Sequence, residues 1–420
     1  MGHFIFINSN ATGLKTINEF LNLGHEISYI ESTSFITYDE NNSNMEIKNR
    51  INNSYKLDDT DDLSKIINLA LNINLKKKVD GVICVAESSM EPASSVAEAL
   101  NLPFPSYQSV LNCRNKEKTR SILKNKNIEN ARYHLSQTYD DVLKASKIIG
   151  FPLVIKPKSS RNSYATAIVK EPSELKAVWD EIISEVNQSP LKMREQYLRG
   201  FLIEEYLQGE MVSVEIIHDG KNANVFMISE RKRSKQKEIT EYRIDMPANI
   251  EESDLLSCVD YTKSIVEALE LSHGIFHIEI MLTDRGPVLV EVNPRLMGGY
   301  MPYLYNTLTK DNLFHYLGEV HLGKEAYIPE FKIGNMVASA IRFDVAADCQ
   351  FLGCDFNKIV KSHFSLAYYE LPQDNKIHRV SSGDTIGRIQ VIFDNHQLLE
   401  DTLLSFFKEV NDSLGLELFS

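Results

Sequence analysis

The sequence predicts an α/β protein whose middle part is of the α+β type. Two observations support this prediction. In the first 112 residues, apolar strand patterns alternate with helical patterns, and such alternation indicates an open parallel sheet covered by helices. Further along the chain, strand patterns joined by short polar turns are typical of antiparallel hairpins. We therefore expect an N-terminal open parallel-sheet domain followed by a mixed region.

The N-terminal domain is expected to span residues 1–112 and to end at the prolines of Leu102–Pro105. Its first turn, Asn8–Gly13, could receive an anion at a helix N-terminus, but it lacks the G-x-G-x-x-G spacing of dinucleotide-binding proteins. The polar run Tyr38–Asn44 predicts a solvated loop. The expected strands are His3–Asn8, His25–Ile30 and Gly81–Ala86, and the expected helices are Thr12–Leu23, Leu63–Leu75 and Glu91–Leu100.

A second region is expected over residues 113–310, and a C-terminal subdomain over residues 311–420. Within the second region, residues 151–205 are expected to form a small lid subdomain, and strand Phe201–Leu207 is expected to return to the large lobe. Asp219-Gly220 is a strong hairpin turn signal. The other expected elements are strands Phe151–Lys156, Ala165–Lys170, Val212–His218, Ala223–Ser229 and Gly334–Phe343, and helices from about Asn112–Asn115 and over Ser173–Val186, Ser253–Leu269 and Gln397–Leu414.

The most informative segment is a predicted hairpin that runs from His277 to Asn293 and turns near Arg285. If Arg285 is the tip of an odd-length loop, Glu279 faces Glu291 and His277 faces Asn293. Opposed residues have Cβ atoms about 4.5–5.5 Å apart, where like charges are unfavourable unless something compensates them. Magnesium is held by one or two carboxylates plus substrate phosphates. Glu279, Glu291 and the amide oxygen of Asn293 are therefore candidate metal ligands.

The alternation of the second hairpin strand places Glu291, Asn293 and Arg295 on one side and points Val290 and Val292 into a core. Two alternatives remain open. An even-length loop would slip the pairing by one residue. An ordinary exposed hairpin, with its polar side chains in solvent, would show the same alternation.

Four motifs accompany this hairpin in the chain. They are Asn115–Arg120, Phe151–Pro157, Leu202–Gly209 and Glu291–Arg295 followed by Gly298-Gly299. In this order they resemble the helix start, the first nucleotide-binding strand, the hinge strand and the metal-binding hairpin of the ATP-grasp superfamily of carboxylate–amine ligases. The resemblance covers about residues 110–300. Within the superfamily, the chain is similar to bacterial L-amino-acid ligases of the bacilysin type, which make dipeptides.

The resemblance implies an ATP-grasp fold and a site for ATP with Mg²⁺ or Mn²⁺. It implies that Lys116 and Lys156 contact the nucleotide phosphates from two sides. It also implies that Glu204, Glu205 and Leu207 hold adenine, chiefly through main-chain groups. The net charge of the chain is −13, so any ATP site must make its own local positive patch.

Two positions depart from the family pattern. Met211 stands where relatives have a ribose-binding glutamate, so Glu210 or Glu215 would take the ribose hydroxyls. The glycine-rich phosphate loop of the family is replaced by Lys158–Thr166, which contains no glycine. In this loop, Arg161 could replace backbone donors with a bidentate phosphate contact.

The implied reaction joins a carboxylate, expected to be an amino acid or a small peptide, to an amine through an acyl phosphate, and releases ADP and phosphate. The candidate catalytic residues are Lys156, Arg161 and Arg295, and the guanidinium of Arg295 would neutralise charge that develops during the reaction. Two other functions remain open. One is another acyl-phosphate enzyme, such as a carboxylase or a purine-pathway ligase, and the other is a non-catalytic nucleotide-binding protein.

The composition of the chain limits which partners and which cellular location we expect. The excess of acidic residues argues against a nucleic-acid partner. We expect no membrane partner and a cytoplasmic location, because the chain shows neither a signal-peptide pattern nor an apolar run of about 18 residues. The five cysteines lack C-x-x-C spacing, which argues against a disulfide framework or a zinc site. A homodimer is a possible assembly.

Overall fold

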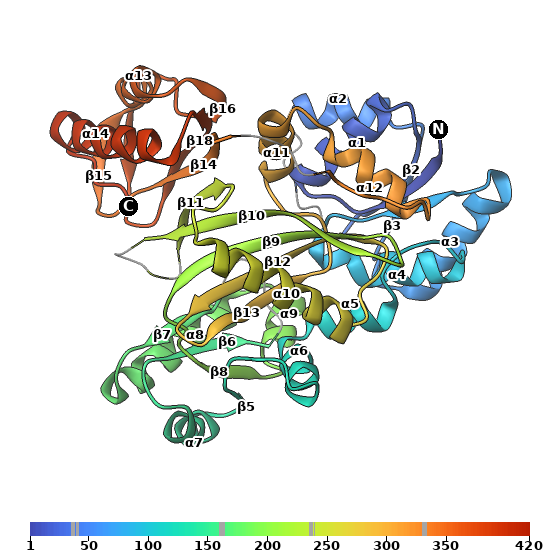
Figure 1. The fold of residues 1–420 in the computed structure, drawn as a ribbon, viewed down its shortest axis with the longest axis horizontal. Helices are drawn as coiled ribbons and strands as arrows, with labels where there is room; N and C mark the ends of the chain where they lie inside the picture. The colour runs from blue at the N-terminus through green and yellow to red at the C-terminus, as the bar shows by residue number, and fades with distance from the viewer. Residues whose placement is uncertain (35–37, 39–41, 159–163, 235–237, 239, 330–333) are drawn as a thin grey trace.

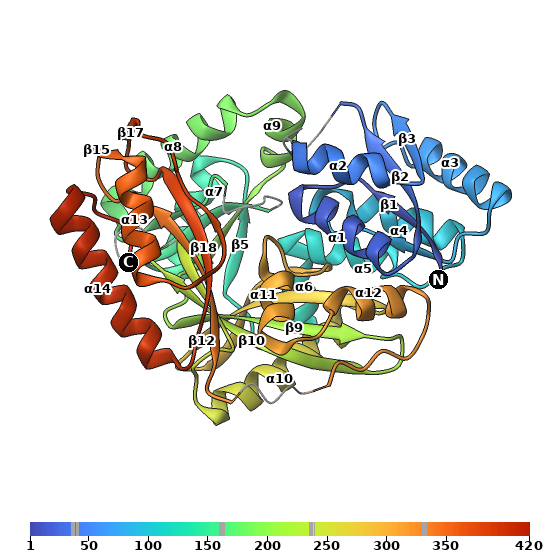
Figure 2. The same cartoon turned by 90° about the horizontal axis from the view of Figure 1, so that it is seen from above.

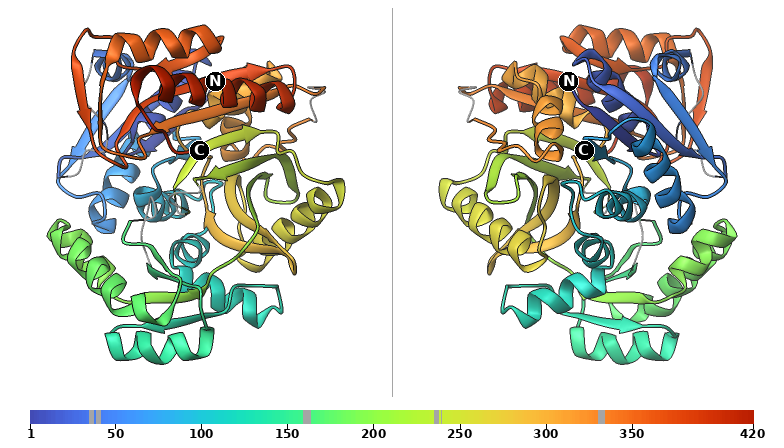
Figure 3. Two further views of the ribbon diagram at one scale, coloured as in Figure 1. Left: turned by 90° about the vertical axis from the view of Figure 1, so that its left-hand side faces the viewer. Right: turned by 90° about the vertical axis from the view of Figure 1, so that its right-hand side faces the viewer.

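The computed structural model describes residues 1–34, 38, 42–158, 164–234, 238, 240–329 and 334–420. A large antiparallel sheet forms its centre (Figure 1). A four-stranded sheet between residues 133 and 205, called the lid sheet below, lies at one end of the molecule (Figure 3). No helix in the described ranges combines the length and the apolar composition needed to cross a membrane.

The N-terminal domain contains strands β1 (His3–Ile7), β2 (Glu26–Ser32), β3 (Asn53–Leu57) and β4 (Gly81–Ile83) and helices α1 (Ala11–Asn22), α2 (Asn42–Arg50), α3 (Leu63–Lys76) and α4 (Met90–Ala99). The strands form one sheet in the order β3-β2-β1-β4, and every pair is parallel. The predicted open parallel sheet is therefore confirmed.

Strand β3 and helix α2 of this domain were not predicted. Strand β3 lies at the edge of the sheet, where half-buried and exposed residues alternate, so it has no continuous apolar run. Helix α2 is mostly polar and begins at Asn42. The prediction of a loop over Tyr38–Asn44 is therefore wrong for its last residues, and residues 39–41 lie outside the described ranges.

Helices α5 (Tyr107–Arg114) and α6 (Lys116–Asn125) connect the N-terminal domain to the lid sheet. The side chain of Asn115 caps α6 by accepting hydrogen bonds from the main-chain nitrogens of Glu117 and Lys118. Such a cap satisfies amide groups that have no partner inside the helix. It also fixes Lys116 as the first residue of α6, as the predicted helix start implied.

The lid sheet has the order β5-β8-β6-β7 and is antiparallel. Its strands are β5 (Tyr133–Ser136), β6 (Leu153–Pro157), β7 (Ala167–Val169) and β8 (Phe201–Glu205), and its helices are α7 (Tyr139–Ile149), α8 (Leu175–Gln188) and α9 (Leu191–Tyr197). The predicted range 151–205 does not include β5 and α7. The prediction that Phe201–Leu207 returns to the large lobe is wrong, because β8 lies inside the lid sheet between β5 and β6.

The central sheet has eight strands in the order β13-β12-β9-β10-β11-β14-β18-β16, and each neighbouring pair is antiparallel. The strands are β9 (Glu210–His218), β10 (Ala223–Arg233), β11 (Glu241–Met246), β12 (Gly274–Thr283), β13 (Gly286–Asn293), β14 (Val337–Asp344), β16 (Leu366–Glu370) and β18 (Thr385–Phe393). Strands β14, β16 and β18 come from the C-terminal region of the chain. They continue the same sheet that carries the predicted metal hairpin.

The remaining elements cover this sheet and join it to its neighbours. They are η1 (Glu87–Ser89), η2 (Pro172–Glu174), α10 (Glu252–Ala268), α11 (Met301–Thr309), α12 (Leu313–His321), β15 (Cys349–Leu352), α13 (Gly353–His363), β17 (Ile377–Val380) and α14 (His396–Leu414). Helices α11 and α12 share a hydrophobic core with α1 and β1 of the N-terminal domain. Helices α13 and α14 pack on the C-terminal strands, on the opposite side of the molecule (Figure 2).

The hairpin β12–β13 has the predicted pairing, although its loop length differs from the predicted one. His277 lies opposite Asn293 and Glu279 lies opposite Glu291. The loop, however, has two residues, because Thr283 pairs with Gly286. A two-residue loop alone would slip the pairing by one residue. The prediction of an odd-length loop is therefore wrong.

A β-bulge at Val290 restores the predicted register. The pairing shifts between Glu279 and Ile280, which lie opposite Glu291 and Leu289, so Val290 is the extra residue. Leu289 and Val292 are buried in the core, whereas Val290 is only half-buried. The prediction that Val290 points into the core is therefore wrong, because the bulge changes the phase of the strand.

Candidate active site

A cavity of about 680 Å³ is lined by residues from three parts of the chain. Glu87 of η1 comes from the N-terminal domain, Glu279 and Glu291 come from the hairpin β12–β13, and Arg342 and Arg388 come from β14 and β18. The predicted metal ligands thus lie in the wall of a cavity. The alternative of an ordinary exposed hairpin does not describe this arrangement.

Glu279 is held by two cationic neighbours inside this wall. Its Oε1 accepts a 3.2 Å hydrogen bond from Nε2 of His277 and lies 3.7 Å from Nη2 of Arg231. Burial alone would raise the pKa of Glu279, but Arg231 and His277 hold it well below its usual range. Glu279 is therefore a carboxylate near neutral pH.

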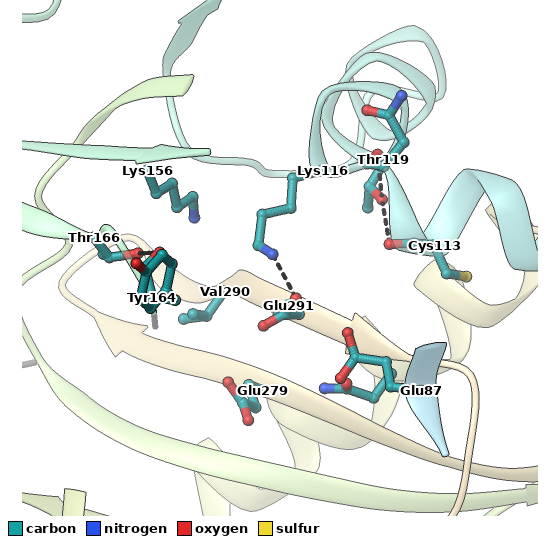
Figure 4. A network of polar contacts seen from close by, with 12 residues as sticks. Glu87, Cys113, Lys116, Thr119, Lys156, Tyr164, Thr166, Glu279, Val290 and Glu291 are labelled. Carbon is teal, nitrogen blue, oxygen red and sulfur yellow. Dashed lines mark hydrogen bonds and ion pairs between the residues drawn. The ribbon is translucent and has the colours of Figure 1, made fainter. Parts of the chain in front are cut away.

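Glu291 is paired with Lys116 of α6. Nζ of Lys116 lies 2.7 Å from Oε1 of Glu291, and Figure 4 shows the lysine reaching from its helix toward the hairpin. Burial alone would lower the pKa of Lys116, but Glu291 raises it above its usual value. Different cations therefore compensate the two opposed glutamates. Lys116 pairs with Glu291, whereas His277 and Arg231 lie beside Glu279.

Lys156 of β6 lies on the lid side of the same group (Figure 4). Its Nζ is 2.5 Å from Oε2 of Glu204, whose Oε1 also accepts a 2.9 Å hydrogen bond from Nε of Arg120. Burial is the main cause that lowers the pKa of Lys156, and Arg120 and Lys116 lower it further. Burial alone would raise the pKa of Glu204, but Arg120 and Lys156 bring it down to about 2.

Lys116, Arg120 and Lys156 together form a local positive patch in an acidic protein. The three cations face two carboxylates, Glu204 and Glu291, so positive charge is in excess by one. Lys116 and Lys156 are nearly buried, at 8% exposure each, and burial strengthens their interaction with an anion. A chain with a net charge of −13 would need such a local patch to bind a nucleoside triphosphate.

The predicted adenine-binding residues lie at the end of β8. Oε1 of Glu205 is 2.7 Å from Nη2 of Arg285 at the hairpin tip, and its Oε2 accepts a 2.8 Å hydrogen bond from Arg132. Arginines engage the carboxylates of both Glu204 and Glu205, so the predicted contacts with adenine would have to come from main-chain groups. Leu207 is half-exposed beyond the strand.

Of the two glutamates considered for ribose, only one is accessible. Glu210 is exposed at the start of β9. Glu215 is fully buried, and its Oε1 accepts a 2.6 Å hydrogen bond from Nδ1 of His277. The alternative that Glu215 takes the ribose hydroxyls is therefore wrong, because its side chain is buried.

His277 links Glu215 to Glu279 and does not itself stand free in the cavity. Each ring nitrogen faces one carboxylate. Burial alone would lower the pKa of His277, but Glu215 and Glu279 raise it to about 9. The ring therefore donates two hydrogen bonds and orients the carboxylate of Glu279.

Arg295 lies beyond the hairpin and contacts the N-terminal domain. Its Nη2 is 3.1 Å from Oε2 of Glu87 and donates a 3.1 Å hydrogen bond to Oδ1 of Asn293. Glu87 was not predicted, although it follows the buried strand β4 at its carboxyl end. Ligands of parallel sheets bind at such ends, so the sequence did carry a signal for it.

The donor set of this wall suits a magnesium ion. It offers the carboxylates of Glu279 and Glu291 and the amide oxygen of Asn293, all of them hard oxygen ligands. Within the described part of the chain, no cluster of three or more His, Cys, Asp or Glu side chains could hold a metal by itself. Two carboxylates are nevertheless sufficient to hold magnesium when phosphate oxygens and water supply its remaining ligands.

Arg161 and the rest of segment 159–163 lie outside the described residues. The predicted role of Arg161 therefore stays a prediction. The chain is described again from Tyr164, whose hydroxyl donates a 2.8 Å hydrogen bond to the main-chain oxygen of Glu185 in α8.

The far wall of the cavity comes from the C-terminal region, to which the sequence assigned no chemistry. Its polar members include Arg342, Tyr368, Arg388 and Gln390. These residues are separated from the hairpin by up to a hundred positions of sequence, and only the continuation of the central sheet brings them to the cavity.

Tyr300 and Tyr368, which line the cavity, take part in contacts between distant segments. Nζ of Lys15 in α1 lies 3.6 Å from the ring centre of Tyr300. The hydroxyl of Tyr300 lies 2.5 Å from that of Tyr368, and both donate hydrogen bonds to Oε1 of Glu370. These four residues, called the tyrosine bridge below, connect the N-terminal domain to β16.

Comparisons with known proteins identify part of the chain. Residues 149–302 match the family model of the ATP-grasp domain. The chain is 27% identical over 251 residues to the uncharacterized protein y4rH of Sinorhizobium fredii, covering 59% of this chain and 49% of that protein. It is 24% identical over 267 residues to an alanine–anticapsin ligase of Bacillus amyloliquefaciens, covering 60% of this chain and 56% of the ligase. The chain thus spans about half the length of these curated relatives.

The whole fold has a counterpart among solved structures. An L-amino acid ligase from Bacillus licheniformis superposes with a TM-score of 0.79 and 21% sequence identity, covering 99% of this chain and 98% of the ligase. At this identity the likeness shows the fold. The fold predicted from the four motifs is therefore confirmed over the full length.

Proposed function

We propose that this chain, which has an ATP-grasp fold and whose residues 149–302 form an ATP-grasp domain, is an ATP-dependent carboxylate–amine ligase. It would phosphorylate a carboxylate to an acyl phosphate and let an amine displace the phosphate, which forms an amide. The likeness to an alanine–anticapsin ligase favours an amino acid as the carboxylate substrate.

One observation carries the proposal. Two opposed carboxylates, Glu279 and Glu291, face the buried lysines Lys116 and Lys156 across the cleft between the hairpin and the lid sheet (Figure 4). A protein that only bound a nucleotide would need the lysines but not a pair of opposed glutamates. The combination suits the transfer of a phosphoryl group, in which charge on the phosphate oxygens must be neutralised.

The lysines, the hairpin and the end of β8 would each bind a different part of the ATP–magnesium complex. Lys156 and Lys116 would each bind phosphate oxygens, and the end of β8 would hold adenine. Glu279, Glu291 and Asn293 would hold a magnesium ion, which would neutralise charge on the β- and γ-phosphates and align them. Lys116 would then exchange its contact with Glu291 for a contact with phosphate.

The substrates would meet beside Arg295. A carboxylate oxygen attacks the γ-phosphorus, the bond to the bridging oxygen breaks, and ADP leaves. The amine then attacks the acyl carbon, the bond to the phosphate oxygen breaks, and the amine loses a proton. Arg295 has a fixed guanidinium, which is held by Glu87 and Asn293, and would stabilise the oxyanion that forms in the second step. We propose Arg161 as a further phosphate contact on the basis of its sequence position.

Two other functions would use the same fold. A carboxylase or purine-pathway enzyme would also form an acyl phosphate, and a nucleotide sensor would bind ATP without turnover. An amide product is favoured by the sequence likeness to an alanine–anticapsin ligase over 60% of the chain.

The test is a screen of pairs of amino acids for phosphate release in the presence of ATP and Mg²⁺, with mass spectrometry of the products. We expect release that requires both amino acids and a product whose mass is that of the pair less one water. A double variant, Glu279→Gln with Glu291→Gln, is the inactive control. Release that depends on bicarbonate would favour a carboxylase. ATP binding without release for any pair would favour a sensor.

A further inference from the structure

Glu215 is a fully buried carboxylic acid on β9, the strand that lies between β10 and β12 in the central sheet. Its surroundings on one side are apolar. Met227 of β10 lies opposite it, Ile217 is the next residue of β9 on the same face, and both belong to a hydrophobic core. Burial of a carboxylate is costly unless the group is paired. An acid at this position therefore needs a specific partner.

The partner of Glu215 is His277 of β12. The two residues lie directly opposite each other, and Nδ1 of His277 donates a 2.6 Å hydrogen bond to Oε1 of the acid. Oε2 of Glu215 has no hydrogen-bond partner among the described residues. His277 is thus the one hydrogen-bond partner of this carboxylate in the described part of the chain, and the contact accounts for an acid beside an apolar core.

The other nitrogen of the ring holds Glu279. Nε2 of His277 donates a 3.2 Å hydrogen bond to Oε1 of Glu279, and the described ranges contain no other hydrogen bond to that carboxylate. Ser213 is the cross-strand neighbour of Glu279 on β9, but its hydroxyl has no hydrogen-bond partner in these ranges. Arg231 lies farther away, at 3.7 Å, and is also paired with Glu241. The ring of His277 therefore sets the direction of the Glu279 carboxylate.

We infer that Glu215 is a positioning residue of the metal site, which acts on Glu279 through the ring of His277. The hydrogen bond to Nδ1 fixes the plane of the ring, and this aims the N–H of Nε2 at Glu279. The inference rests on the proposed function, because it takes Glu279 to be a magnesium ligand. Groups that orient metal ligands typically change metal affinity or activity about ten- to a hundredfold when they are removed.

This inference makes the two opposed glutamates unequal. Glu279 is held inside the sheet by Glu215 and His277, whether or not a ligand is bound. Glu291 is paired with Lys116, which would exchange that contact for a phosphate in the proposed function. Loss of Glu215 should therefore weaken the contribution of the metal to nucleotide binding, while the contribution of the lysines remains.

The test measures this contribution apart from turnover. The dissociation constant of a non-hydrolysable ATP analogue is measured by calorimetry on the full-length protein, with and without Mn²⁺. The ratio of the two constants, called the manganese gain below, reports what the metal site adds. Glu215→Leu should reduce the manganese gain about tenfold or more and leave the constant without metal unchanged. Glu215→Gln keeps the shape and an acceptor oxygen, so it should retain part of the gain.

A double-mutant cycle decides whether Glu215 acts through His277. His277→Gln should also reduce the manganese gain, and Glu215→Leu should then cause no further loss in that background. Asp245→Asn is the matched control. Asp245 is also fully buried in the central sheet, but its carboxylate contacts Arg243 and Ser339 instead. This control should lower the melting temperature without changing the manganese gain.

Each outcome has a separate meaning. An unchanged manganese gain in Glu215→Leu and Glu215→Gln would overturn the inference, even if ligation proceeds. Losses that add in the double variant would do the same, as would a wild type without any manganese gain. A gain that depends on Glu215 through His277, with no ligation of any pair of amino acids, would support the inference and contradict the proposed function.

Discussion

The guanidinium of Arg120 donates a 2.9 Å hydrogen bond from Nη2 to the main-chain oxygen of Val290, the extra residue of the β-bulge. Nε of the same side chain donates a 2.9 Å hydrogen bond to Glu204 in the lid sheet. Arg120 is 1% exposed. One buried side chain therefore connects the lid sheet to the bulge that sets Glu279 opposite Glu291.

Arg120→Met should destabilise the protein, because it leaves the buried carboxylate of Glu204 with Lys156 as its remaining cation. Breaking a buried ion pair in this way costs about 3–5 kcal/mol. The measurement is the free energy of unfolding from denaturant titration. Arg132→Met is the control, because the Arg132 side chain is 60% exposed in its pair with Glu205, and such pairs contribute about 1 kcal/mol or less. Equal losses in the two variants would show that Arg120 has no special role.

Removal of divalent metal should abolish turnover, because Glu279 and Glu291 would then repel the phosphates of ATP. Glu291→Gln should slow the chemical step more than it weakens ATP binding, since the change also releases Lys116 for phosphate. Single-turnover kinetics with and without excess chelator, together with the dissociation constant of ATP, test this. Glu181→Gln, on the exposed face of α8, is the control. Full activity in chelator would remove the metal site from the proposal.

Lys156→Ala should weaken ATP binding about ten- to a hundredfold through one lost charge-assisted contact. The fold should persist, because Glu204 keeps its bond to Arg120. The dissociation constant of ATP, measured by calorimetry, gives the result. Lys170→Ala removes an exposed lysine of the lid and should leave the constant unchanged. An unchanged constant in Lys156→Ala would exclude Lys156 from the phosphate site.

Acid should destabilise the protein through His321 in α12. Burial lowers the pKa of His321 to about 4, although the carbonyl of Pro103 opposes this. The unfolded chain therefore takes up the proton first, near pH 6.5, so stability is present above that pH and is lost as the pH falls toward 4. The loss should be about 2 kcal/mol at pH 5.

The measurement is the difference in unfolding free energy between pH 8 and pH 5. His321→Gln should show a smaller difference than the wild type, and the exposed His134→Gln should show the same difference as the wild type. An identical pH dependence in His321→Gln would mean that another group causes the loss.

The sequence predicted the parallel N-terminal sheet and the opposition of Glu279 and Glu291, because both follow from local patterns of apolar and polar residues. It did not predict how the opposition arises. The bulge at Val290 is tied to Arg120, which lies 170 positions earlier in the chain. No local pattern reports a hydrogen bond between such distant residues, so the loop length was predicted wrongly while the register was right.

The far wall of the cavity shows a second limit. Arg388 and Gln390 lie on a strand that reads as an ordinary alternating strand in the sequence. Their position depends on β14 pairing with β11, which extends the central sheet. The assignment of strand neighbours is a tertiary property, and alternation within one strand does not encode it. Glu87 is different, since its place after a buried parallel strand made it predictable.

The tyrosine bridge has a consequence for the side on which a product leaves the cavity. Lys15, Tyr300, Tyr368 and Glu370 fasten the N-terminal domain to the C-terminal strands. At the lid sheet, the end of β8 is held by ion pairs, in which Glu204 meets Arg120 and Glu205 meets Arg285. We expect the lid to pivot there while the opposite wall stays rigid. Product would then leave on the lid side, and the rate of that opening would set the pace of turnover.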